Sequence, residues 1–163
     1  MQTDMFDALS QPQTKGYKSS YSSVNGKCPH CGASMKMYWH RMTPHLAKTL
    51  VKIYTAISSK GENKIHPHKE MELSTSEHMN MTKLRFHGLI AKVKEKGEVE
   101  RGYWLITRKG AEFLKGEVGV AKRVQTFRNK VVNHEFDYVY IKQVLGSVPY
   151  IESSFDFDLF KGY

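Results

Sequence analysis

The sequence predicts an α+β fold, because helical and alternating hydrophobic periods follow each other along one chain of 163 residues. An apolar stripe recurs every three or four positions between residues 44 and 60 and comprises Leu46, Leu50, Ile53 and Ile57. Residues 89–106 instead alternate as two strands, joined by the charged segment KEKGEVERG. Helices and a hairpin are therefore expected in the same domain.

The first helix is expected to start after Thr43, whose hydroxyl can cap it, with Pro44 at the first helical position. Gly61 lies just beyond its last turn, where a chain leaving a helix often needs positive φ. A short strand is expected immediately before it, in SMKMYWH. After it, the polar segment KGENKIHPHKEME is interrupted by Pro67.

A second helix is expected to start at the capping residues of the run Ser74–Ser76 and to extend to about His87, before Gly88. Its inward residues are predicted to be Met79, Met81 and Leu84.

The hairpin follows, and a third helix starts at Thr107 and buries Phe113 and Leu114. In the return strand, at least one of Tyr103 and Trp104 is expected in the core. The order helix, helix, strand, charged hairpin, strand, helix is that of a winged helix-turn-helix.

These patterns divide the chain into three parts. Residues 1–26 are polar and rich in Ser, and are predicted to be a flexible tail. Residues 27–117 are predicted to hold a zinc knuckle and the winged helix. Residues 118–163 are predicted to be a short C-terminal β/α extension that covers one side of the winged helix, with two strands around Asn129 and an acidic, aromatic end, FDFDLF.

The charge is concentrated in the middle of the chain. The formal net charge is +9, but residues 27–130 carry 21 Lys and Arg against 9 Asp and Glu, whereas residues 131–163 carry 2 against 5. Such a basic segment indicates nucleic acid as the partner rather than a membrane, since no long apolar run or isolated basic amphipathic helix is present. With no secretory signal at the start, a cytoplasmic protein is expected.

The segment CPHCG predicts half of a zinc site, formed by Cys28 and Cys31. The chain has only these 2 cysteines, so histidines must complete the four ligands. His40 and His45 are the nearest pair, and the second lies in the first helical turn.

Two alternatives to that ligand set stay open. His66 and His68 form a rival pair in HPH, because alternate residues of an extended segment share a side. A metal-free turn with buried cysteines is the other. In either metal case zinc would be structural, because four protein ligands leave no position for a reactive water.

The segment MTKLRFHGLIAKVKEKGEVERGYWLITRKGAEFLKGE contains "L-x-x-x-G-L-I", a β-wing and "L-I-T-x-x-G-x-x-F-L". Residues 43–117 thereby resemble the winged-helix domains of MarR-type and PadR-type transcription regulators. Residues 28–160 are also similar to a set of uncharacterised phage and prophage proteins, through CPHCG, TKLRFHGLI and GYWLITRKG. This second likeness implies a phage origin, hence the host cytoplasm, and a DNA-linked role.

A winged helix would place its second helix in the major groove of double-stranded DNA and its wing on the phosphates. Side chains suited to base and phosphate contact on that helix are Ser76, His78, Asn80, Lys83 and Arg85. The wing would contribute Lys94, Lys96 and Arg101, although Glu95, Glu98 and Glu100 lie among them.

The main alternative is a protein-interaction module that modulates a host polymerase, replication or defence protein, which the acidic wing and acidic end favour. An enzyme is not expected: no phosphate-cradling GxxxxGK[ST], no GxSxG and no paired-carboxylate motif occurs. A ββα-metal nuclease would need a carboxylate beside His40, which has none as a sequence neighbour. The oligomeric state stays open.

Overall fold

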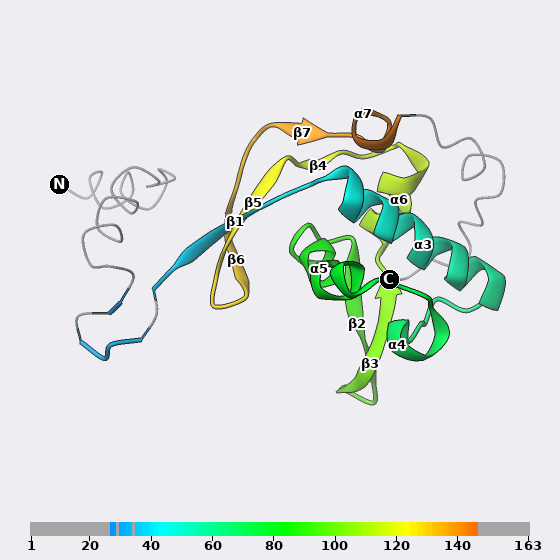
Figure 1. The fold of residues 1–163 in the computed structure, drawn as a ribbon, viewed down its shortest axis with the longest axis horizontal. Helices are drawn as coiled ribbons and strands as arrows, with labels where there is room; N and C mark the ends of the chain where they lie inside the picture. The colour runs from blue at the N-terminus through cyan, green and yellow to red at the C-terminus, as the bar shows by residue number, and fades with distance from the viewer. Residues whose placement is uncertain (1–26, 29, 34, 147–163) are drawn as a thin grey trace.

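The structure is a computed structural model, and it describes residues 27–28, 30–33 and 35–146 (Figure 1). Their fold is α+β, with helices packed beside three small antiparallel sheets. The predicted flexible tail at residues 1–26 and the end FDFDLF lie outside the described residues.

Helix α3 spans Pro44–Lys60 and forms the centre of the domain. Thr43 Oγ1 accepts a hydrogen bond from the Leu46 N–H at 3.3 Å, and Gly61, at φ 75°, donates its N–H to Ile57 O at 2.9 Å. Both predicted ends are therefore confirmed. The predicted apolar stripe is buried, together with Tyr54 and Thr49.

Two further helices follow, α4 (Pro67–Glu70) and α5 (Thr75–Phe86). Helix α5 packs on α3 with Met81 and Leu84 buried. Met79 was predicted to face inward, and this is wrong, because its side chain is 75% exposed. At 3.6 residues per turn, Glu77, Met81 and Leu84 share one side of the helix and Met79 faces the opposite side.

The predicted hairpin is formed by β2 (Ile90–Glu95) and β3 (Glu98–Ile106), with a tight turn at Lys96 and Gly97. Both turn residues have positive φ, as a two-residue hairpin turn of this kind requires. Trp104 is buried as expected of this strand, and it pairs with Ile65 in an isolated bridge. Helix α6 (Arg108–Lys115) then starts at the predicted cap Thr107 and buries Phe113 and Leu114.

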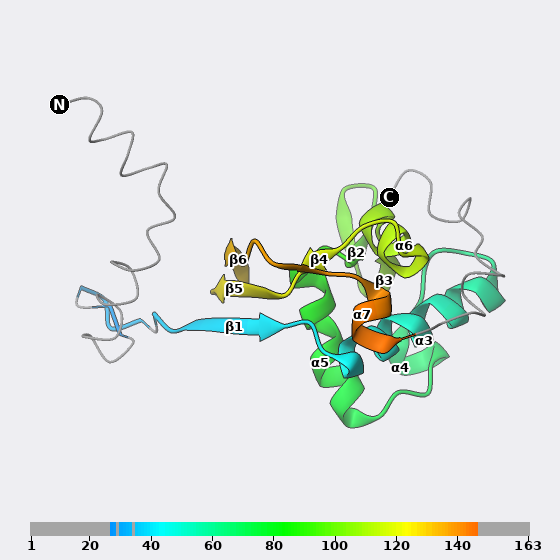
Figure 2. The same cartoon turned by 90° about the horizontal axis from the view of Figure 1, so that it is seen from above.

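The remaining elements are β1 (Met37–Arg41), β4 (Val120–Ala121), β5 (Arg123–Phe127), β6 (Lys130–His134), β7 (Tyr138–Val139) and α7 (Ile141–Leu145). Strand β1 pairs antiparallel with β5, in a sheet of order β1-β5-β6. Seen from above, this sheet extends to one side of the helices (Figure 2). The segment before α3 and the segment after α6 are thus parts of one sheet.

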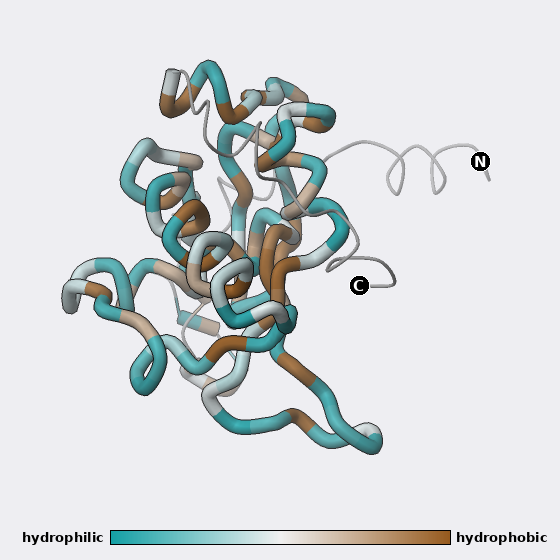
Figure 3. The backbone as a smooth tube through the Cα atoms, turned by 90° about the vertical axis from the view of Figure 1, so that its right-hand side faces the viewer, coloured by the Kyte–Doolittle hydropathy of each residue, from teal (hydrophilic) through white to brown (hydrophobic). Residues whose placement is uncertain are grey.

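The core lies where α3, α5, α6 and the β2–β3 hairpin meet, and hydrophobic stretches gather there in the middle of the molecule (Figure 3). Ile141 of α7 is also part of this core, so the C-terminal extension packs on α3. In the described part of the chain, no helix is long and apolar enough to cross a membrane.

Candidate nucleic-acid interface

Helix α5 is held firmly at its N-terminus by a capping box. Ser74 Oγ accepts from the Glu77 N–H at 3.2 Å, and Glu77 Oε2 accepts from the Ser74 N–H at 2.8 Å. The other carboxylate oxygen of Glu77 lies 2.6 Å from Lys52 Nζ of α3. The Lys52 ammonium, followed by the Ser74 N–H, lowers the pKa of Glu77 to about 2. The helix therefore has a fixed position on α3.

The outward side of α5 is open to solvent around Met79. Three of the predicted DNA-contacting side chains form a chain of contacts along its flank. Ser76 Oγ lies 3.2 Å from His45 Nε2, and Asn80 Nδ2 donates to Ser76 O at 2.8 Å. Lys83 Nζ in turn donates to Asn80 Oδ1 at 2.6 Å. These amide and hydroxyl groups are thus pre-positioned at the surface.

Arg85 lies at the C-terminal end of the same helix and is exposed. Its Nη2 donates to the backbone carbonyl of Asn129, in the turn between β5 and β6, at 3.3 Å. The guanidinium charge therefore lies between α5 and that turn.

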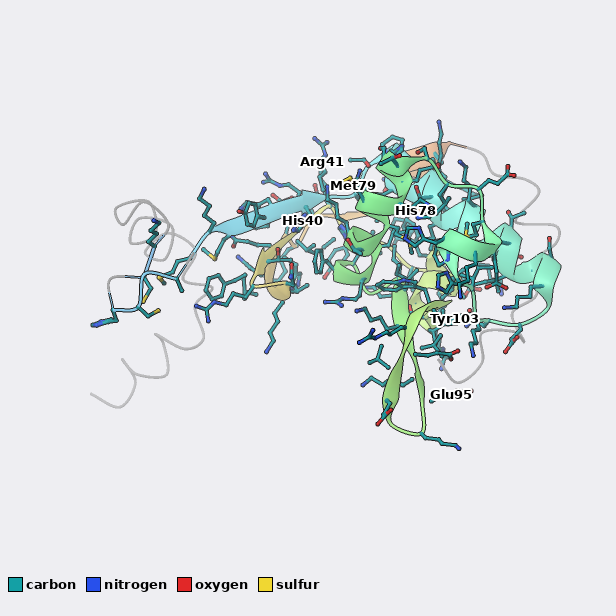
Figure 4. The ribbon with its side chains drawn as sticks, turned by 60° about the horizontal axis from the view of Figure 1, so that its bottom comes forward. His40, Arg41, His78, Met79, Glu95 and Tyr103 are labelled. Carbon is teal, nitrogen blue, oxygen red and sulfur yellow. The ribbon has the colours of Figure 1, made fainter. Side chains whose placement is uncertain are left out.

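His78 is placed differently from the other predicted residues of α5. Its ring stacks on His68 of α4, with centroids 4.1 Å apart and an interplanar angle of 1°. His78 lies on the flank of α5 towards α4, and Arg41 and Met79 lie together on another side (Figure 4). The structure does not bring His78 to the open face.

The wing residues Lys94, Lys96 and Arg101 are all exposed. Glu95 and Glu98 face each other across the hairpin near its tip and are also exposed. Glu100 is instead paired with Lys64 at 2.6 Å. The hairpin tip therefore carries charge of both signs.

The ion pairs among the described residues lie on several surfaces, and one of them, Lys52–Glu77, joins α3 to α5. The basic residues that they engage are Lys52, Lys60, Lys64, Arg108, Lys115, Lys122 and Arg123. No described carboxylate lies within 4.0 Å of the basic groups of Arg41, Lys83, Arg85, Arg128 and Lys130 around α5, and the same holds for other described cations such as Lys48, Lys69, Lys92 and Lys109. Sequence reasoning missed Arg41, Arg128 and Lys130 as neighbours of α5. Arg41 precedes α3 and lines a cavity with Asn80 and Lys83, and the β5–β6 turn reaches α5 through the contact of Arg85 with Asn129.

The two predicted zinc-binding cysteines lie in a turn in which Gly32 has φ 68° and donates its N–H to Cys28 O at 2.9 Å. Both thiols are free of a disulfide. Hydrogen bonds from the backbone of Cys31 and His30 lower the pKa of the Cys28 thiol. A turn that stabilises the thiolate suits a soft metal ion such as zinc.

The four histidines named as possible zinc ligands have other contacts. His40 Nε2 lies 2.8 Å from Thr126 Oγ1, and burial, followed by the charge of Lys83, lowers the pKa of His40. His45 contacts Ser76, and the rings of His66 and His68 lie 6.3 Å apart. No three His, Cys, Asp or Glu residues of the described ranges form a group that could hold a metal ion. Zinc binding at the cysteine turn and the histidines that would complete the site therefore stay predictions.

Comparisons with protein-family models, with curated proteins and with solved structures found no match to this chain. We therefore infer function from the geometry and charge around α5.

Proposed function

We propose that residues 43–117 form a winged helix-turn-helix that binds double-stranded DNA, and that the protein is a phage-encoded transcription regulator with structural zinc. The element order α3, α4, α5, β2, β3, α6 supports this, with Ile65 paired to Trp104 between the first two helices. In such a fold α5 enters the major groove and the β2–β3 hairpin lies on the adjacent backbone.

The observation that carries the proposal is the open face of α5 with its border of basic side chains that have no carboxylate neighbour. Lys83 and Arg85 lie on the helix itself, with Arg41 and Arg128 beside it. Cations that are not neutralised within the protein are available to phosphates, and phosphate contacts supply much of the affinity for DNA.

Specific readout would come from Asn80 and Arg85. An Asn amide can bond adenine through two atoms, and an Arg guanidinium can do the same for guanine. Arg85 is exposed and Asn80 is half-buried on α5, and the Ser76 carbonyl orients the Asn80 amide. The hairpin would add Lys94, Lys96 and Arg101 to the phosphates, while Glu95 and Glu98 keep its tip from binding too tightly.

The test is fluorescence anisotropy of the full chain with duplex and single-stranded DNA over a series of salt concentrations. The wild type should bind duplex DNA, with an affinity that falls steeply as salt rises. Lys83→Ala/Arg85→Ala should weaken binding by about tenfold or more.

The matched control removes two cations from another surface, Arg108→Ala/Lys115→Ala, and should bind almost as the wild type does. Salt-independent binding, or equal losses in both double variants, would contradict the role of α5. Zinc measured on the same samples should be one ion per wild-type chain and should be lost in Cys28→Ser, together with some stability.

A second candidate function is that of a protein-interaction module acting on a host polymerase, replication or defence protein. The observation that favours it is a set of exposed apolar side chains on and near β6 and β7, on more than one face of these strands. Its members are Val131, Val132, Phe136 and Tyr138, exposed by 46%, 50%, 76% and 47%. This function replaces the first if duplex DNA does not bind at any salt concentration and one protein partner binds stoichiometrically but is lost in Phe136→Ser.

A further inference from the structure

The sheet formed by β1, β5 and β6, here called the arm, contacts α5 near the C-terminal end of that helix. Next to the N-terminus of α5, His45, four residues beyond β1, contacts Ser76. Near the C-terminus of α5, the ring centroids of His40 of β1 and Phe86 are 4.9 Å apart, and Arg85 Nη2 donates to the backbone carbonyl of Asn129. The arm therefore meets α5 at the C-terminal end of that helix, while the β2–β3 hairpin projects below the helix (Figure 1).

The turn of the arm has a defined conformation. Arg128 and Asn129 have φ of 48° and 61°, and Phe127 pairs with Lys130 across them. A two-residue turn of this kind joins the strands tightly. Its basic side chains thus project from a fixed point rather than from a loose loop.

Charge is partitioned along the arm. At the end of β5 away from the turn, Arg123 is paired with Glu135, and the preceding Lys122 is paired with Asp137 at 3.5 Å. At the turn, Arg128 and Lys130 have no carboxylate of the described chain within 4.0 Å. The carboxylates of Glu135 and Asp137 neutralise Arg123 and Lys122 and leave the turn positive. Arg41 lies opposite Arg123 in the β1–β5 register and has no described carboxylate within 4.0 Å.

Between β1 and α5 lies a cavity of about 270 Å³ whose lining suits an anion. Its charged and polar side chains are those of His40, Arg41, Thr43, His45, Asn80 and Lys83, with no carboxylate among the lining residues. Arg41 and Lys83 supply positive charge, and Asn80 supplies a hydrogen-bond donor. A phosphate oxygen is the group that this combination binds best.

We propose that the arm is a second DNA-binding element, which holds backbone phosphates on the side of α5 away from the β2–β3 hairpin. Arg41 and Lys83 bind one phosphate at the cavity, and Arg128 and Lys130 bind further phosphates at the turn. This inference rests on the proposed function. It adds that α5 is held in the groove from two sides.

The experiment is a salt titration of duplex-DNA binding by the full-length Arg41→Gln/Arg128→Gln/Lys130→Gln protein. All three residues are exposed, so the variant should fold, which a thermal melt verifies. The slope of log K against log salt should be shallower by about 2 to 3, because each lost phosphate contact removes about 0.9. With equal binding of the two proteins at 1 M salt, that change in slope makes the variant roughly 40-fold to 300-fold weaker at 0.15 M salt.

The matched control is Lys60→Gln/Arg108→Gln/Lys115→Gln, which lowers the net charge equally but removes cations that are paired elsewhere. It should keep the wild-type slope. The arm proposal is overturned if the arm variant also keeps the wild-type slope and affinity, or if both triple variants lose the same slope. In those cases the proposed function stands as long as Lys83→Ala/Arg85→Ala weakens binding. If the wild type binds no duplex DNA, the proposed function and the arm proposal both fall.

Discussion

Replacing Glu77 by Gln should destabilise the protein by about 1–2 kcal/mol at pH 7, because Glu77 fixes α5 in two ways. Its carboxylate closes the capping box with Ser74 and lies 2.6 Å from Lys52 Nζ. Gln can still accept from the Ser74 N–H, so the loss is chiefly that of the charge. The fall of the Glu77 pKa from 4.5 to about 2 corresponds to about 3 kcal/mol, and Lys52 is half exposed, so screening by solvent reduces this.

The pH dependence of this loss tests its electrostatic origin. Glu77 has a lower pKa in the folded state than in the unfolded state, so its stabilisation is complete above pH 4.5 and is lost as the pH falls towards 2. In urea unfolding followed by circular dichroism, the difference between wild type and Glu77→Gln should fall at pH 3 to below half of its value at pH 7. The exposed i,i+4 pair of Glu112 offers a control, and Glu112→Gln should cost less than about 0.5 kcal/mol. An equal Glu77→Gln loss at both pH values would refute the reasoning.

Three other predictions concern buried groups. Asn63→Ala should lower the free energy of unfolding in urea by about 2–4 kcal/mol, because the Asn63 side chain accepts from the Ile106 N–H at 2.9 Å and donates to the Ile106 carbonyl at 2.8 Å. A loss below about 1 kcal/mol would contradict this prediction. His87 is buried and its pKa is lowered to about 4, chiefly by desolvation. As the pH falls from 6.5 to 4, the stability of the wild type should therefore fall more steeply than that of His87→Gln. Parallel stability curves would contradict this. Gly110→Ala should lower the melting temperature despite the higher helix propensity of Ala, because the new Cβ would lie 2.1 Å from Leu89 O. An unchanged melting temperature would contradict this and would show that α6 and the segment at Leu89 move apart easily.

The sequence determined most of the local structure. Thr43, Ser74 and Thr107 each cap a helix as expected, and the charged hairpin turns at Lys96 and Gly97. These features depend on hydrogen bonds and backbone angles within a few residues, so they can be predicted from short segments. The wrong prediction for Met79 was also made from a short segment. Met79 and Met81 lie on opposite sides of one helix, and the packing of α5 on α3 buries Met81 and leaves Met79 exposed.

The surroundings of α5 were decided by the tertiary structure. The sequence placed Ser76, Asn80, Lys83 and Arg85 on one helix, but it did not show that His78 would stack on His68.

Nor did the sequence show which segments would border that helix. The contact of His40 with Thr126 joins residues 86 positions apart, and it belongs to the pairing of β1 with β5 that brings Arg41 and Arg128 beside α5. The pairing of β1 with β5 has to offset the entropy that is lost when a long loop closes. Which strand pairs with β1 depends on packing across the whole domain. No hydrophobic period or cap within either strand records that selection. Charge composition therefore predicted an anionic partner, and only the folded chain showed which basic side chains lie beside α5.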